Sequence, residues 1–181
     1  MPLLYIRTHL DGVLSAVAPL GLAASASTAL VVDVDPEGPL YPGRLSLADL
    51  IRVGPRADDL APVRAGLAVL RSGGVHLADA AELLGAFADR WPCVVVRLPS
   101  GVDPGPIGKV VQVLPLLPSP LAVDPVGRSV LQTTGLAPVP STGHLVLPRP
   151  ARNVFGDLLR GVVRRRSRWI RAWRPVWEWS W

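Results

Sequence analysis

The chain contains 181 residues, which is enough for one domain with a substantial apolar core. Hydrophobic residues make up 49% of the sequence and charged residues only 18%, a composition that excludes a mostly disordered protein. The single cysteine, Cys93, excludes an internal disulfide and a cysteine metal cluster, and the three scattered histidines have no ligand spacing, so we assign no metal.

The net charge of +5 is concentrated at the C-terminal end of the chain. Residues 1–150 hold 11 basic and 12 acidic residues, whereas residues 151–181 hold 8 arginines and only 2 acidic residues. Five of the 6 tryptophans also lie in this last segment. We therefore divide the chain into a domain of residues 1–150 and a basic, tryptophan-rich tail of residues 151–181.

The N-terminal part predicts a strand, a helix, a strand and a second helix. Apolar residues 3–6 predict the first strand, and residues 13–27 predict a helix that Pro19 disturbs. Residues 29–32 predict a second strand, and a helical pattern starts at Ser46. Because residues 13–32 carry no charge, a membrane span or a signal peptide is an alternative. Pro19 and the scarcity of large apolar side chains favour a buried helix and strand instead.

The remainder of the 1–150 domain continues the alternation of helices and strands. We predict one helix or two short helices over residues 56–70 and a helix over residues 77–90. We also predict strands over residues 94–96, 109–117 and 144–147, and a short helix within residues 123–134. Strands that alternate with helices indicate an α/β fold with a mostly parallel sheet flanked by helices.

Two segments resemble motifs of one known family. The first is VVDVDPEG at residues 31–38, followed by LADLI at residues 47–51, and the second is RWPCVVVRLPSG at residues 90–101. In this order they resemble segments of the MinD/ParA family of P-loop ATPases, over a framework of roughly the first 150 residues. The resemblance implies a truncated P-loop NTPase-like fold, in which Asp33 and Asp35 match carboxylates that hold Mg²⁺ and position the attacking water.

Departures from the family pattern argue against ATP hydrolysis. The family needs a glycine-rich loop with Lys-Ser or Lys-Thr before its first helix, but residues 7–15 read RTHLDGVLS. The only lysine, Lys109, is distant in sequence, and Arg97 replaces an acidic residue of the second motif. We therefore expect no catalysis and no cofactor, with Asp33 and Asp35 as vestigial ligands that now shape a strand-ending turn. Binding of ATP with Mg²⁺ is the open alternative.

The tail predicts an amphipathic helix that begins at Asn153 and stops before Pro175. Apolar and aromatic side chains recur at spacings of three and four residues, and arginines occupy the other face. This pattern is typical of the membrane interface, and the family resemblance also implies a membrane-targeting C-terminal helix. The residues expected to contact a membrane or a partner are Phe155, Leu159, Arg164, Arg165, Arg168, Trp169, Arg171, Trp173 and Trp177.

Packing of the same apolar stripe on the body of the protein or on a partner subunit is nearly as well supported, and nucleic acid is the least favoured partner. The leading hypothesis is a non-catalytic MinD/ParA-like scaffold or positioning protein in a bacterial cytoplasm, peripheral to the inner face of the membrane. Its partner would be a second copy or an intact ATPase of the same family. The alternatives are a slow nucleotide-binding ATPase and an assembly subunit whose tail docks on another protein.

Overall fold

The computed structural model describes residues 3–8, 12–62, 66–102, 104, 109–118, 129–139 and 143–180. They form an α/β fold around a seven-stranded sheet in which every pair of neighbouring strands is parallel, in the order β3-β2-β4-β1-β5-β6-β7. The strands are β1 (Leu3–Thr8), β2 (Ala29–Asp33), β3 (Leu67–Leu70), β4 (Val94–Arg97), β5 (Lys109–Leu116), β6 (Ser129–Thr133) and β7 (Leu145–Leu147).

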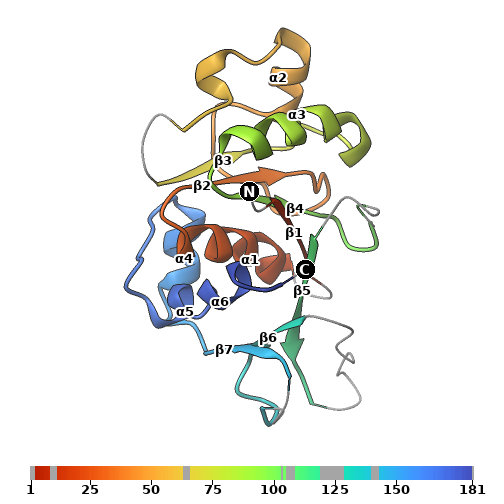
Figure 1. The fold of residues 1–181 in the computed structure, drawn as a ribbon. Helices are drawn as coiled ribbons and strands as arrows, with labels where there is room; N and C mark the ends of the chain where they lie inside the picture. The colour runs from red at the N-terminus through yellow and green to blue at the C-terminus, as the bar shows by residue number, and fades with distance from the viewer. Residues whose placement is uncertain are drawn as a thin grey trace.

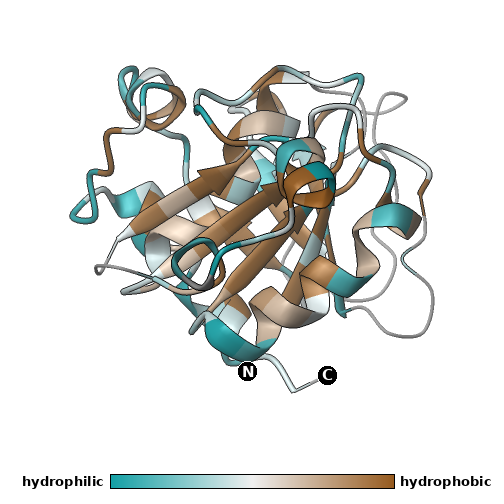
Figure 2. Ribbon diagram, turned by 90° about the horizontal axis from the view of Figure 1, so that it is seen from above, coloured by the Kyte–Doolittle hydropathy of each residue, from teal (hydrophilic) through white to brown (hydrophobic). Residues whose placement is uncertain are grey.

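The central strands are buried on both faces, and their sequences show why. Every residue of β2 and of β4 is buried, and both strands are runs of apolar, largely β-branched residues that each end in one charged side chain. Such runs are typical of parallel strands that helices cover on both sides. Figure 2 shows these strands as the most hydrophobic part of the molecule.

One face of the sheet is covered by α1 (Gly12–Ser25) and by the tail (Figure 1). Helix α1 is buried from Ala16 to Ala24 although Pro19 lies inside it. The tail forms three short helices, α4 (Val154–Leu159), α5 (Arg168–Arg171) and α6 (Arg174–Trp177), and all three contact α1. Residues of the sheet, α1 and the tail therefore share one apolar core.

The other face is covered by α2 (Leu47–Val53), the 3₁₀ turn η1 (Ala57–Asp59) and α3 (Leu77–Arg90). Helix α2 begins with a capping box, in which Ser46 Oγ accepts from the Asp49 N–H at 3.2 Å and Asp49 Oδ2 accepts from the Ser46 N–H at 3.1 Å. Helix α3 buries Ala80, Leu84 and Phe87 against the sheet.

Most predicted elements are confirmed, including the helix at residues 77–90 and the strands that begin at Leu3, Ala29 and Lys109. The one or two helices predicted over residues 56–70 were wrong over residues 67–70, which form β3, while residues 57–59 form the short turn η1 and residues 63–65 lie outside the described part. The short helix predicted within residues 123–134 was also wrong over residues 129–133, which form β6, while residues 123–128 lie outside the described part. Strand β3 is a short apolar run (LAVL), which periodicity alone does not distinguish from buried helix. Strand β6 (SVLQT) contains only two apolar residues and shows no alternation that would mark a strand.

The predicted helical character of the tail is confirmed, but its continuity is not. The helical pattern from Asn153 is interrupted after Leu159, where Gly161 adopts a φ of 77° and the chain turns before α5. A positive φ ends helices readily at glycine because no Cβ clashes with the backbone. The turn places α5 and α6 back against α1 instead of extending one long helix away from the body.

Candidate functional site

Three central strands bring polar residues to the carboxyl-terminal end of the sheet. Asp33 ends β2 and Arg97 ends β4, and these two residues are paired across the two strands in the sheet register. Thr8 ends β1, which lies on the other side of β4. Because ligands of open α/β sheets bind outside the carboxyl ends of the strands, this end of the sheet is the candidate site.

The Arg97 guanidinium lies at the centre of this site. Its Nη2 donates to Asp35 Oδ2 at 2.9 Å, and its Nη1 lies 3.4 Å from Asp33 Oδ2. The Arg97 and Asp33 side chains are only 1% exposed, so both ion pairs are shielded from solvent. We name Asp33, Asp35 and Arg97 the charge cluster.

The same guanidinium holds the loop that follows β2. Nη1 of Arg97 donates to the Pro39 carbonyl at 2.7 Å, and its Cζ lies 5.2 Å from the centre of the Tyr41 ring. Gly38 is required at this point, because a Cβ there would lie 1.5 Å from Nη2 of Arg97. Loop and charge cluster therefore form one packed unit.

Hydrogen bonds within the loop use the remaining oxygens of the carboxylates. Asp33 Oδ1 accepts from the Asp35 N–H at 3.0 Å, and Asp35 Oδ1 accepts from the N–H groups of Glu37 and Gly38. This is the strand-ending turn that the sequence predicts for a D-x-D-P-x-G segment. It fixes both carboxylates toward Arg97.

Burial dominates the electrostatics of Asp33. Desolvation raises the pKa of Asp33 to about 6, although the Arg97 guanidinium and the Asp35 N–H both act to lower this pKa. Burial also raises the pKa of Tyr41 far above its ordinary value, and its hydroxyl donates to the Ala16 carbonyl at 2.7 Å. The phenol is therefore a neutral structural donor.

Chemically, the charge cluster is an internally paired site, in which one guanidinium faces two carboxylates. The positive charge that faces the two carboxylates belongs to the protein itself, and Ser15 Oγ lies 3.5 Å from Nη2 of Arg97. Within the described ranges, no group of three or more histidine, cysteine or acidic residues is placed to hold a metal ion. The loop expected to replace the phosphate-binding loop includes residues 9–11, which lie outside the described residues.

Sequence reasoning named Arg97 only as a departure from a motif and did not predict its ion pairs. The signal was nevertheless present, because Asp33 and Arg97 each end an apolar run that was expected to form a buried strand. Two charged side chains at the carboxyl ends of neighbouring buried strands must be compensated by each other or by a ligand.

The expected membrane or partner residues of the tail divide into two sets. Trp169 and Trp173 are buried against α1, while Phe155, Leu159 and Trp177 are partly buried. A Cβ at Gly21 of α1 would lie 2.3 Å from the Trp169 ring, so this glycine permits the close approach of the tail. Trp169 Nε1 also donates to Gln132 Oε1 of β6 at 2.7 Å, a contact that the sequence did not predict.

The arginines of the tail face outward. The expected residues Arg164, Arg165, Arg168 and Arg171 are all exposed. Arg160 and Arg164 pair with the buried carboxylate of Asp157, whose pKa these hydrogen bonds lower, and Arg165 donates to the Ser27 carbonyl at 2.6 Å. In the described part of the chain no partner is found for a further set of exposed arginines, namely Arg166, Arg168, Arg171 and Arg174.

None of the helices among the described residues is both long and apolar enough to cross a membrane. Comparison with known proteins finds no family model and no curated protein that matches this chain. The resemblance to the MinD/ParA family therefore stays a prediction from the two quoted motifs.

Proposed function

We propose that this protein is a non-catalytic scaffold or positioning protein of the MinD/ParA type, and that its strand-end carboxylates no longer serve a nucleotide. The observation that carries the proposal is the buried Arg97 guanidinium between Asp33 and Asp35. In a metal-dependent ATPase these carboxylates would face a divalent cation and, beyond it, the phosphates. Here a covalently attached cation stands in that position, so Mg²⁺ would have to displace a buried ion pair.

The charge cluster then has a structural role. It pairs two buried carboxylates with one buried cation and fixes the loop of residues 34–41, whose Tyr41 hydroxyl donates to Ala16 in the N-terminal part of α1. A scaffold benefits from a surface that does not change with the nucleotide state. An intact ATPase of the same family, or a second copy of this chain, is the partner that the resemblance implies.

The test is binding and hydrolysis of ATP in the presence of Mg²⁺. We expect no saturable binding of ATP at concentrations up to about 1 mM, where a dissociation constant of that size corresponds to a binding free energy of roughly −4 kcal/mol. We also expect no phosphate release above the protein-free rate. Saturable binding that is lost in Asp35→Ala would instead establish the alternative, a nucleotide-binding slow ATPase. Arg97→Lys serves as the matched variant, because it keeps the charge and loses the two-pronged contact.

The tail supports a peripheral position on the inner face of a membrane, with a contact made by arginines. Trp169 and Trp173 are already buried in the body of the protein, whereas Arg166, Arg168, Arg171 and Arg174 are exposed. Each basic residue near an anionic surface contributes about 1 kcal/mol, so four residues would give useful and salt-sensitive binding.

Vesicle co-sedimentation tests this part of the proposal. The first variant replaces Arg166, Arg168, Arg171 and Arg174 with glutamine, and the control replaces the exposed arginines Arg44, Arg52, Arg56 and Arg90. Both variants lose the same charge, and neither removes the buried tryptophans. We expect the parent and the control to sediment with anionic vesicles at low salt, and the tail variant to stay in solution. If the parent does not sediment either, the peripheral membrane position is wrong, and a protein partner of the tail becomes the better hypothesis.

A further inference from the structure

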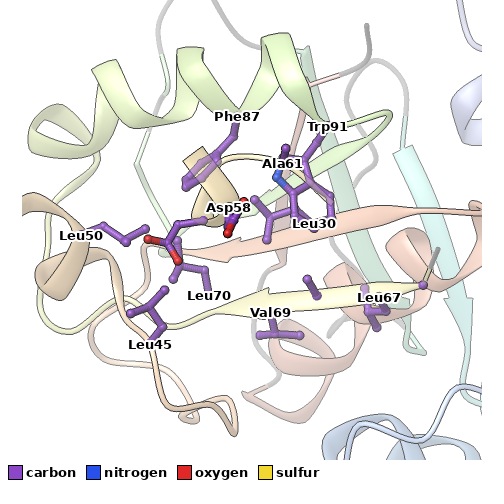
Figure 3. A pocket seen from close by; sticks show the side chains of 13 residues that line it. Leu30, Leu45, Leu50, Asp58, Ala61, Leu67, Val69, Leu70, Phe87 and Trp91 are labelled. Atoms are coloured by element: carbon purple, nitrogen blue, oxygen red, sulfur yellow. The ribbon is translucent and has the colours of Figure 1, made fainter. Parts of the chain in front are cut away.

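A cavity of about 370 Å³ lies at the β3 edge of the sheet, away from the charge cluster (Figure 3). Leu30 of β2 and Leu70 of β3 form its apolar floor, and Phe87 and Trp91 at the C-terminal end of α3 form an aromatic wall. Its volume falls in the range of roughly 300–1,000 Å³ that small-molecule sites occupy. The cavity is thus large enough for a molecule with one aromatic ring and a short polar chain.

The aromatic wall contains an unsatisfied hydrogen-bond donor. Trp91 is only 6% exposed, and its buried Nε1 has no hydrogen-bond partner. In Figure 3 the indole nitrogen lies on the side of the ring that faces the cavity. A buried N–H without an acceptor costs about 1–3 kcal/mol, and an acceptor atom of a bound molecule would recover this energy.

Two carboxylates stand at the same cavity. Asp58 and Asp59 of η1 both line it, and in the described part of the chain Asp58 has no hydrogen-bond or ion-pair partner. Asp59 uses Oδ2 to accept from the Arg56 N–H at 2.9 Å. Among the described lining residues, Asp58 and Asp59 carry the charged side chains, and no lysine or arginine lines the cavity.

We infer that the cavity binds a small amphiphilic cation, a molecule with an apolar body, a protonated amine and a hydrogen-bond acceptor. The apolar body would lie on Leu30, Leu70 and Phe87, the acceptor would take the Trp91 N–H, and the amine would face Asp58. Anionic molecules are disfavoured because the two carboxylates repel them. The inference concerns a different face of the sheet from the tail and does not depend on the proposed scaffold function.

Nuclear magnetic resonance of the tryptophan indole N–H groups tests the inference on the intact protein. The Trp91 signal is assigned from its loss in Trp91→Phe, and phenylalaninamide is the probe because it carries a ring, an amine and an amide oxygen. We expect a saturable downfield shift of the Trp91 signal with a dissociation constant of about 1 mM, as is usual for a ligand of this size. 3-Phenylpropanamide lacks the amine and should bind more weakly, and phenethylamine lacks the acceptor and should not shift the signal downfield.

Two single-charge variants locate the amine. Asp58→Asn should weaken phenylalaninamide binding about two- to fivefold, the effect of losing one partly exposed ion pair. Glu82→Gln removes an exposed charge from α3 that does not line the cavity, and it should leave binding unchanged. The inference is overturned if no probe shifts the Trp91 signal at about 10 mM, or if the neutral amide binds as tightly as phenylalaninamide. It is also overturned if Asp58→Asn and Glu82→Gln have equal effects.

Discussion

Arginine has opposite roles in the charge cluster and in the tail. Arg97 is 1% exposed and touches two carboxylates, a carbonyl and an aromatic ring. The arginines of the tail are exposed, and apart from Arg160 and Arg164, which pair with Asp157, their side chains form no ion pair among the described residues. The same residue type therefore acts as an internal cation at one end of the sheet and as a surface charge on the helices over its face.

The difference follows from what each segment must bury. Strand β4 lies in the middle of the sheet, so the charged residue at its end has no route to water and must be paired. In the tail, tryptophan and aliphatic side chains supply the buried surface, and arginines occupy the remaining positions of the short helices. Removing a charge should therefore be costly at Arg97 and almost neutral at the unpaired tail arginines Arg166, Arg168, Arg171 and Arg174, whereas removing an aromatic ring from the tail should be costly.

The largest expected effect is that of Arg97→Met. This change leaves Asp33 and Asp35 buried without their cation and should lower the free energy of unfolding by about 3–5 kcal/mol. Denaturant unfolding followed by circular dichroism measures it. Arg52→Met is the matched control, because the Arg52 side chain is 78% exposed and pairs with Asp49 on the surface. It should change stability by less than about 1 kcal/mol, and equal effects of the two changes would break the comparison.

Trp173→Ala tests the statement that the tail belongs to the core. Trp173 is fully buried and stacks edge to face on Trp169 with 5.6 Å between ring centres. Its truncation should cost about 3–5 kcal/mol, as is typical of large core aromatics. Arg174→Ala changes the neighbouring exposed residue and should stay within about 0.5 kcal/mol. A tail that was detached from the body in solution would tolerate both changes equally well.

The raised pKa of Asp33 predicts a pH dependence of stability. The Asp33 carboxyl, whose pKa is about 6, binds a proton below about pH 6 in the folded state, whereas in the unfolded chain it binds one only near its ordinary pKa of 3.8. The free energy of unfolding should therefore fall as pH rises from about 4 to about 6, by an amount of up to about 3 kcal/mol, and this contribution should be flat above that window. Asp33→Asn should remove this dependence. If the slope is unchanged in Asp33→Asn, other carboxylates are responsible.

The smallest effects concern two helical glycines with opposite environments. Gly21→Ala places a methyl group against the Trp169 and Trp173 rings, so it should destabilise the protein by about 1–3 kcal/mol. Gly85→Ala in α3 meets no atom within 4 Å and should stabilise the protein by about 0.5–1 kcal/mol, because alanine favours the helix. Thermal unfolding of the two variants gives the sign directly. A stabilising Gly21→Ala would mean that the tail does not pack closely on α1.

Local patterns in the sequence determined most of the regular structure. The apolar runs at residues 29–32 and 94–96 identified the central strands, and the periodicity of residues 77–90 identified α3. Strand β3 escaped because a run of four apolar residues has no period of its own, and β6 escaped because its sequence, SVLQT, neither alternates nor forms an apolar run. Their pairing with β2 and β5 stabilises them, and this pairing is not visible along the chain.

The sequence by itself also determined that charge and aromatic residues gather in the tail and that two aspartates follow a buried strand. The tertiary structure decided what these residues touch. Strand order places Arg97 beside Asp33, 64 residues away in the chain, and the turn at Gly161 returns the tryptophans to α1. Amphipathic patterns specify that a face must be covered, whereas only the packing of the whole chain specifies what covers it.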